Sequence, residues 1–183
     1  IPQAHQSLHE GQWRRSDFVG IEVRNKTLGI VGLGKVGSEV ARRAQAFQMQ
    51  IVGHDPFVSP DYAKLLNVEL LSLEELLEKS DFISIHTPLT KTTDALIGSK
   101  ELSNMKSGAR IINCARGGLI DESALLEQIQ NGHLGGAALD VFSTEPITDS
   151  PLFKNEKIIV TPHLGASTTE AQVNVAIQVA EQM

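Results

Sequence analysis

The feature that most constrains the fold is an alternation that begins at Lys26, where short apolar runs alternate with segments of helical pattern. Six runs are rich in apolar residues: Thr27–Val31, Ile51–His54, Phe82–His86, Arg110–Asn113, Ala137–Val141 and Ile158–Thr161. Most are almost continuously apolar, which is typical of strands buried on both faces of a parallel sheet. The alternation predicts an α/β fold with a doubly wound parallel sheet.

Helix signals occupy the gaps between these runs. One apolar stripe at helical spacing is formed by Val36, Val40, Ala41, Ala44 and Phe47. The capping signals are the boxes Ser72–Glu75 (opening Leu73–Lys79) and Ser167–Glu170 (opening the final helix), and Asp121 with Gly132 around a helix over Glu122–Asn131. Residues 1–25 lack sustained periodicity, so we expect an arm or linker there and the domain over residues 26–183.

Composition excludes several classes of protein. The 183 residues suit about one domain. The net charge of −6 and the aromatic content of 4% argue against a nucleic-acid surface. No apolar run approaches the ~18 residues that cross a bilayer, so we expect no membrane partner. A single cysteine, Cys114, excludes a disulfide within the chain and fits a reducing compartment such as the cytoplasm. The six histidines show no metal-ligand spacing, so no metal site is predicted.

A glycine-rich loop, GLGKVG, follows the first apolar run. In this context Gly32 permits a tight turn, Gly34 lets a pyrophosphate approach the backbone, and Gly37 lets helix and strand pack closely. Lys35 and Val36 then begin a helix whose free N–H groups point at the phosphates. The motif alone is weak, but its position between a strand and a helix predicts a dinucleotide site.

Asp55 ends the second apolar run, where an acidic side chain can accept hydrogen bonds from the adenosine ribose hydroxyls. A carboxylate there would repel a 2′-phosphate, and Pro56, Phe57 and Val58 offer no cation to bind one. We therefore expect NAD rather than NADP. The alternative is a capping or turn aspartate before Pro56.

Polar residues also follow the later runs, at the sheet edge where ligands of parallel sheets bind. Thr87 either faces the cofactor or satisfies local backbone, and Asp140 either meets the nicotinamide or makes a structural hydrogen bond. Cys114 is expected to be a small buried filler rather than a nucleophile. Arg116, Glu145 and His163 each follow a different run, so they should converge as an acid–base unit beside an anion clamp.

The motifs, taken in order, resemble the Rossmann-like NAD-binding domain of the D-isomer-specific 2-hydroxyacid dehydrogenases over about Phe18 to Met183. The resemblance rests on the GLGKVG loop, Asp55, His86–Leu89, Asn113–Gly118, Ala138–Phe142, Glu145–Pro146 and Pro162–Thr168. It implies Arg116, Glu145 and His163 as catalytic residues. It also implies NAD bound by Gly32, Gly34, Lys35, Val36, Gly37, Asp55, Thr87, Cys114, Ala115, Arg116, Asp140, His163 and Gly165.

The resemblance further implies a small 2-hydroxy or 2-oxo acid substrate and a homodimer or homotetramer, with residues 1–17 helping to build the dimer. The family's substrate domain is missing from this chain, so we expect a piece of a longer protein that binds NAD with little turnover by itself. We expect the acid to be phosphorylated, with an unphosphorylated acid such as glycerate or hydroxypyruvate as the alternative within the family. An NAD-sensing binding protein related to the family is the alternative from another class.

Overall fold

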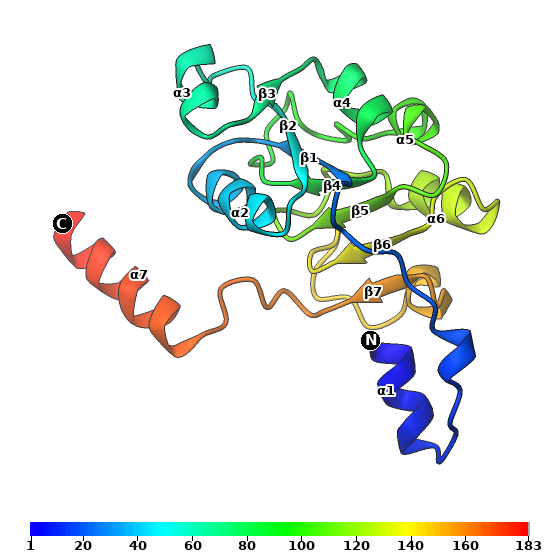
Figure 1. The fold of residues 1–183 in the computed structure, drawn as a ribbon. Helices are drawn as coiled ribbons and strands as arrows, with labels where there is room; N and C mark the ends of the chain where they lie inside the picture. Colours follow the sequence, from blue (N-terminus) through cyan, green and yellow to red (C-terminus); the bar gives the residue numbers. More distant parts are fainter. Residues whose placement is uncertain (183) are drawn as a thin grey trace.

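Seven parallel strands form one sheet in the computed structural model, which describes residues 1–182 (Figure 1). The strands are β1 (Thr27–Val31), β2 (Gln50–His54), β3 (Glu69–Leu70), β4 (Phe82–Ile85), β5 (Arg110–Asn113), β6 (Gly136–Leu139) and β7 (Ile158–Val160). Their order across the sheet is β3-β2-β1-β4-β5-β6-β7, and every neighbouring pair is parallel. The predicted doubly wound α/β fold is confirmed, and the sequence missed only the two-residue β3 among these strands.

Helices connect the strands and cover both faces of the sheet, and two further helices precede the first strand and follow the last. They are α1 (Pro2–His9), α2 (Lys35–Ala46), α3 (Pro60–Leu65), α4 (Leu73–Lys79), α5 (Ser99–Asn104), α6 (Glu122–Gln130) and α7 (Thr169–Gln182). Two 3₁₀ turns, η1 (Arg15–Asp17) and η2 (Pro151–Lys154), complete the set.

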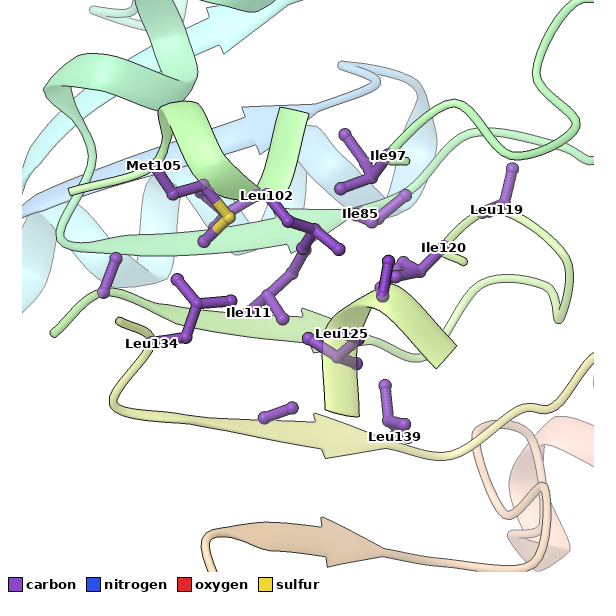
Figure 2. Close-up of a cluster of buried hydrophobic side chains, with 14 of the residues drawn as sticks. Ile85, Ile97, Leu102, Met105, Ile111, Leu119, Ile120, Leu125, Leu134 and Leu139 are labelled. Atoms are coloured by element: carbon purple, nitrogen blue, oxygen red, sulfur yellow. The ribbon is translucent and has the colours of Figure 1, made fainter. Parts of the chain in front are cut away.

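Two apolar clusters hold the layers together. The larger cluster packs α4, α5 and α6 against the central strands, and Leu102, Ile111 and Leu125 in it are fully buried (Figure 2). The smaller cluster packs α2 against β1 and β2, with Ile30 and Ala41 fully buried. Each fully buried aliphatic side chain contributes about 1.5–3 kcal/mol, so these clusters fix the strand ends in place.

The capping signals account for most helix boundaries. Ser72 and Glu75 form the predicted box at the start of α4, and Asp121 accepts hydrogen bonds from two backbone N–H groups of α6. The box expected at Ser167 is wrong, because α7 begins at Thr169 and Thr168 Oγ1 accepts from Ala171 N. Ser167 N instead donates to Leu164 O, which places Ser167 in the preceding turn.

The two end helices lie far apart: in Figure 1, α1 is below the edge strand β7 and α7 is at the far left. Within the segment predicted to be an arm, α1 lies beside the edge strand β7, and Gln3 Nε2 donates to Glu156 O. At the other end, α7 projects away from the sheet. Over the described residues, no helix has the length and apolar character needed to cross a membrane.

Candidate functional site

The glycine loop lies where the sheet order places β1 between β2 and β4, the crevice in which doubly wound sheets bind nucleotides. Gly32 follows β1 directly with a φ of +95°, a backbone conformation that L side chains rarely adopt. A Cβ on Gly32 would lie 2.8 Å from His86 O, at the end of β4. Only glycine therefore lets the two strand ends approach this closely.

The next two glycines differ in their surroundings. A Cβ on Gly34 would meet nothing within 4 Å, so its backbone faces open space that a ligand can enter. A Cβ on Gly37 would lie 2.0 Å from Gly32 O, so Gly37 is where α2 packs onto the loop. Gly34 is the N-cap of α2 and offers no capping side chain, while Lys35 and Val36 are exposed. The N-terminus of α2 is thus open to an anion.

Asp55 follows β2 and is anchored to the glycine loop itself. Its Oδ2 accepts from Leu33 N at 2.8 Å, and its Oδ1 accepts from Phe57 N at 2.9 Å. The hydrogen bond from Phe57 N closes a turn around Pro56, so the alternative role expected for Asp55, that of a turn aspartate, is also present. Each carboxylate oxygen has a further lone pair, so the turn leaves room for hydrogen bonds from a ribose.

A hollow of about 310 Å³ continues from the start of α2 across the ends of β4 and β5. It is lined by Val36, His86, Thr87, Pro88, Cys114, Ala115 and Arg116. Thr87 Oγ1 is buried there and has no hydrogen-bond partner among the described residues. A buried hydroxyl without a partner is costly, and a bound polar ligand would satisfy it. Together with the open Gly34 and the uncapped α2, this orphan hydroxyl shows that the residues present fit a dinucleotide.

Cys114 is exposed, so the expectation of a buried filler is wrong. It lies one residue beyond the end of β5, where the chain turns outward into the loop. Partial burial of the sulfur and the negative charge of Asp140 raise the pKa of the thiol. A raised pKa disfavours the thiolate, which is the nucleophilic form of a cysteine.

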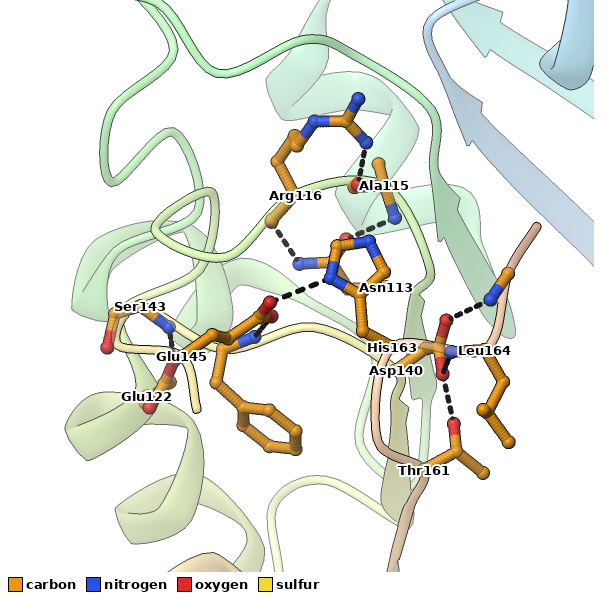
Figure 3. A network of polar contacts seen from close by, with 12 residues as sticks. Asn113, Ala115, Arg116, Glu122, Asp140, Ser143, Glu145, Thr161, His163 and Leu164 are labelled. Carbon is orange, nitrogen blue, oxygen red and sulfur yellow. Dashed lines mark hydrogen bonds and ion pairs between the residues drawn. The ribbon is translucent and has the colours of Figure 1, made fainter. Parts of the chain in front are cut away.

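The loop that carries Arg116 is held by Asn113, the last residue of β5 (Figure 3). Asn113 is 2% exposed; its Oδ1 accepts from Ala115 N, and its Nδ2 donates to Arg116 O. The guanidinium of Arg116 donates to Ala115 O at 2.6 Å. Among residues 1–182, no hydrogen bond joins it to Glu145 or His163, so this structure leaves the guanidinium outside the acid–base pair.

Glu145 and His163 meet across the ends of β6 and β7 (Figure 3). His163 Nδ1 lies 2.7 Å from Glu145 Oε2, and the two side chains are 51% and 33% exposed. The hydrogen bond with His163, followed by one from Phe142 N, lowers the pKa of the Glu145 carboxyl. A carboxylate in this position orients the ring, which leaves the other ring nitrogen free to exchange a proton.

Asp140 builds the loop that presents His163. The carboxylate is 4% exposed and accepts from Thr161 Oγ1, Leu164 N and Gly165 N, while its backbone oxygen accepts from His163 N. His163 itself has a φ of +54°, which is uncommon for a residue other than glycine. Hydrogen bonds from Thr161 and the loop N–H groups lower the pKa of Asp140 against the opposing effect of burial. Asp140 therefore makes the structural hydrogen bonds that were the alternative to a nicotinamide contact. It lies one residue beyond β6, which ends at Leu139, and not inside the strand as the apolar run suggested.

A second hollow, of about 280 Å³, adjoins the acid–base pair. Phe142, Pro146, Ile147, Phe153, Val160 and Pro162 give it mostly apolar walls, and Glu145 and His163 form its polar end. Across the part of the chain that the structure describes, no group of three His, Cys, Asp or Glu side chains could hold a metal ion.

Two polar residues at this edge received no role from the sequence. Asn113 ends β5 and fixes the Arg116 loop, as described above. Glu122 begins α6 and accepts a hydrogen bond from Ser143 N at 2.6 Å. For Asn113 the sequence did carry a signal: an amide residue that ends an apolar run is expected to be buried, and a buried amide needs hydrogen-bond partners. Nothing in the sequence indicates that Glu122 reaches a loop 21 residues away.

Comparison with known proteins agrees with this geometry. The family model for the D-isomer specific 2-hydroxyacid dehydrogenase, NAD binding domain, matches residues 1–165. A relative named D-3-phosphoglycerate dehydrogenase, from Bacillus subtilis, is 53% identical over 100% of this chain. The chain spans only 35% of that relative's length.

Two solved structures are similar in fold and sequence. A glyoxylate reductase from Paecilomyes thermophila superposes with a TM-score of 0.89 at 38% identity, covering 94% of this chain and 52% of its own. An NAD-dependent formate dehydrogenase from Staphylococcus aureus, in complex with NAD, superposes with a TM-score of 0.90 at 33% identity, and the match covers 98% of this chain and 54% of that one. The family match over most of the chain, the similar folds and a site that fits a dinucleotide agree, and the chain belongs to the D-isomer specific 2-hydroxyacid dehydrogenase family as its NAD-binding domain.

Proposed function

We propose that this chain is the NAD-binding domain of a D-3-phosphoglycerate dehydrogenase. The full-length enzyme would transfer a hydride between NAD and C2 of 3-phosphoglycerate or 3-phosphohydroxypyruvate, at the entry to L-serine biosynthesis. The 2.7 Å contact between Glu145 and His163 carries the proposal, because it supplies the acid–base group that oxidation of a hydroxyl requires. The 53% identity to a relative of that name favours the phosphorylated substrate over glyoxylate, whose reductase is 38% identical.

Three side chains of this domain would take part in the reaction. His163 takes the proton of the C2 hydroxyl during oxidation and returns it during reduction, which contributes about 10²–10⁴-fold. Glu145 holds the imidazole ring and stabilises its protonated form. The exposed guanidinium of Arg116 would exchange its bond to Ala115 O for the substrate carboxylate and polarise the neighbouring carbonyl. NAD, when bound, supplies the acceptor or donor of the hydride.

The cofactor would occupy the edge of the sheet from β2 to β7. Backbone groups of Gly32, Gly34, Lys35, Val36 and Gly37 would hold the pyrophosphate at the start of α2, and Asp55 would accept from the ribose hydroxyls. The nicotinamide half would lie against the residues that follow the later strands: Thr87, Cys114, Ala115, Arg116, Asp140, His163 and Gly165. The buried hydroxyl of Thr87 supports this placement most directly.

The domain by itself should bind NAD and turn over little substrate. Both hollows beside the site open to solvent, and a second domain would be needed to exclude water from the reacting atoms. A homodimer or homotetramer built with residues 1–17, and a cytoplasmic location, stay predictions from the sequence.

An NADH-oxidation assay on the full-length protein tests the proposal. The panel consists of 3-phosphohydroxypyruvate, hydroxypyruvate, glyoxylate and pyruvate. The proposal expects the largest kcat/KM with the phosphorylated acid. Preference for an unphosphorylated acid would retain the mechanism but reject the substrate. NADH binding without turnover of any acid would reject the enzyme and favour an NAD-sensing binding protein.

A further inference from the structure

The loop that carries Glu145, residues 141–146, is held by a carboxylate that the proposed reaction does not use (Figure 3). Glu122 Oε1 accepts from Ser143 N at 2.6 Å, a short distance typical of a charge-assisted hydrogen bond. Among the side-chain hydrogen bonds of residues 1–182, the other one that leaves this loop is the contact between Glu145 and His163. Glu122 and His163 therefore hold the Glu145 loop from two different directions.

The start of α6 explains why Glu122 is free for this contact. Asp121 caps the helix, and its carboxylate accepts from both Ser123 N and Ala124 N. Glu122, the next residue, is therefore not needed to cap the helix. The positive end of the helix dipole also favours a negative charge at the first helical position, which stabilises ionised Glu122 where it stands.

The contact lies directly beside the one that Glu145 makes with its own loop. Phe142 N donates to Glu145 Oε1 at 2.8 Å, and the next backbone N–H, that of Ser143, donates to Glu122. Two consecutive peptide groups are thus pinned by two carboxylates. Rotation of the peptide between Phe142 and Ser143 would break the Glu122 contact, and the adjoining peptide carries the N–H of Phe142 that orients Glu145.

The same loop touches the segment that carries Arg116. A Cβ on Gly117 would lie 1.7 Å from Phe142 O and 2.7 Å from Ser143 N, so only glycine allows this approach. Glu122 follows the Arg116 segment in sequence, and it reaches one of the same two residues, Ser143, through its backbone N–H. Glu122 therefore fastens the Glu145 loop to the start of α6, and the close approach of Gly117 brings the Arg116 segment against the same part of the loop.

We propose that Glu122 is a positioning residue, which holds the Glu145 loop so that Glu145 Oε2 stays within hydrogen-bond distance of His163 Nδ1 and in register with Arg116. The proposal rests on the proposed function, because it assigns Glu122 to the geometry of that reaction. Glu122 itself contacts neither substrate nor cofactor in this scheme.

Substitution of Glu122 in the full-length protein should affect turnover and spare cofactor binding. For Glu122→Ala we expect kcat with the preferred acid to fall about 10- to 100-fold, because displacement of a reacting group by about 1 Å has an effect of this size. The Kd of NADH should stay within about twofold, since Asp55 and the glycine loop are untouched. Glu122→Gln keeps an acceptor oxygen without the charge, and should recover kcat to within about fivefold of the parent.

Three further variants separate positioning from helix stability. Glu127→Ala removes an exposed glutamate of the same helix that makes no side-chain hydrogen bond among the described residues, and should leave kcat unchanged. Ser143→Ala should also leave kcat unchanged, because the donor to Glu122 is the backbone N–H. Glu122→Met keeps the length of the side chain without an acceptor, and replaces Glu122→Ala should that variant not fold.

The pKa of the Glu145 carboxyl, followed by NMR of its side-chain carbon, is the second readout. The hydrogen bonds from His163 and Phe142 N lower this pKa, so loosening of the loop in Glu122→Ala should raise it toward its ordinary value. An unchanged kcat together with an unchanged pKa of Glu145 would overturn the positioning role. If Glu145→Gln also keeps full kcat, the proposed function fails as well; if Glu145→Gln is impaired, only the role of Glu122 is lost.

Discussion

Gly34 and Gly37 lie three residues apart in the same loop, yet alanine at each should produce a different loss. A methyl group on Gly37 would meet Gly32 O at 2.0 Å and Ile30 Cγ2 at 3.2 Å, and both neighbours are buried. The backbone oxygen cannot rotate away, so α2 must shift from the sheet. We expect Gly37→Ala to lower the free energy of unfolding by about 3 kcal/mol, the upper part of the range for overpacking.

A methyl group on Gly34 meets nothing within 4 Å in the chain. Alanine is a poorer N-cap than glycine but restricts the unfolded chain, so the two effects oppose each other and should leave stability within about 1 kcal/mol. The methyl group would instead occupy the space that the pyrophosphate needs. We expect the Kd of NADH to rise at least about tenfold, which corresponds to about 1.4 kcal/mol.

Chemical denaturation and NADH fluorescence titration on the same two variants measure both quantities. Gly37→Ala should lose stability and affinity together, whereas Gly34→Ala should lose affinity alone. The account of the loop would be refuted by a Gly34→Ala variant that binds NADH like the parent. It would equally be refuted by equal stability of the two variants.

Four further predictions concern single side chains. Asp55→Ala should lower the preference for NADH over NADPH, measured as a ratio of Kd values, because the carboxylate that repels a 2′-phosphate is gone. Asp140→Ala should lower the melting temperature by several degrees, because it leaves Leu164 N and Gly165 N without an acceptor. Burial lowers the pKa of His86, so as pH falls the unfolded chain takes up a proton before the folded chain does. The free energy of unfolding should therefore fall below about pH 6.5. Denaturation midpoints measured at two pH values should show a smaller loss for His86→Gln. Because the pKa of Glu145 is lowered in the folded protein, ionised Glu145 stabilises the fold above the ordinary carboxyl pKa. This stabilisation should be lost as pH falls through the pKa of the folded state. NMR titration of the Glu145 side chain should show that lowered pKa.

The fold was predictable because its strands lie in the middle of a parallel sheet, where both faces are buried and apolar runs are nearly continuous. β3 escaped notice because a two-residue strand at the sheet edge leaves no run to detect. The short helices α3 and α5 escaped for a related reason, since six residues are too few to show a clear helical period. The cap of α7 was misplaced by one residue because Ser167 and Thr168 are both good capping residues.

The site was predictable in outline because parallel strands end at one edge, so residues that follow different strands must approach one another. The sequence could not show that the Asp140 carboxylate bonds Leu164 N and Gly165 N, or that Glu122 bonds Ser143 N. These contacts depend on which loops meet in space. Buried carboxylates have several possible partners, and the pattern of residue types does not choose among them.

The most direct test of the account compares the full-length protein with its His163→Ala variant in the reduction of 3-phosphohydroxypyruvate by NADH. We predict that kcat falls about 10²–10⁴-fold, because the proton donor is removed. The Kd of NADH should change by less than about threefold, since the pyrophosphate and ribose contacts lie elsewhere in the crevice. Full turnover by His163→Ala would contradict the assignment of the acid–base pair.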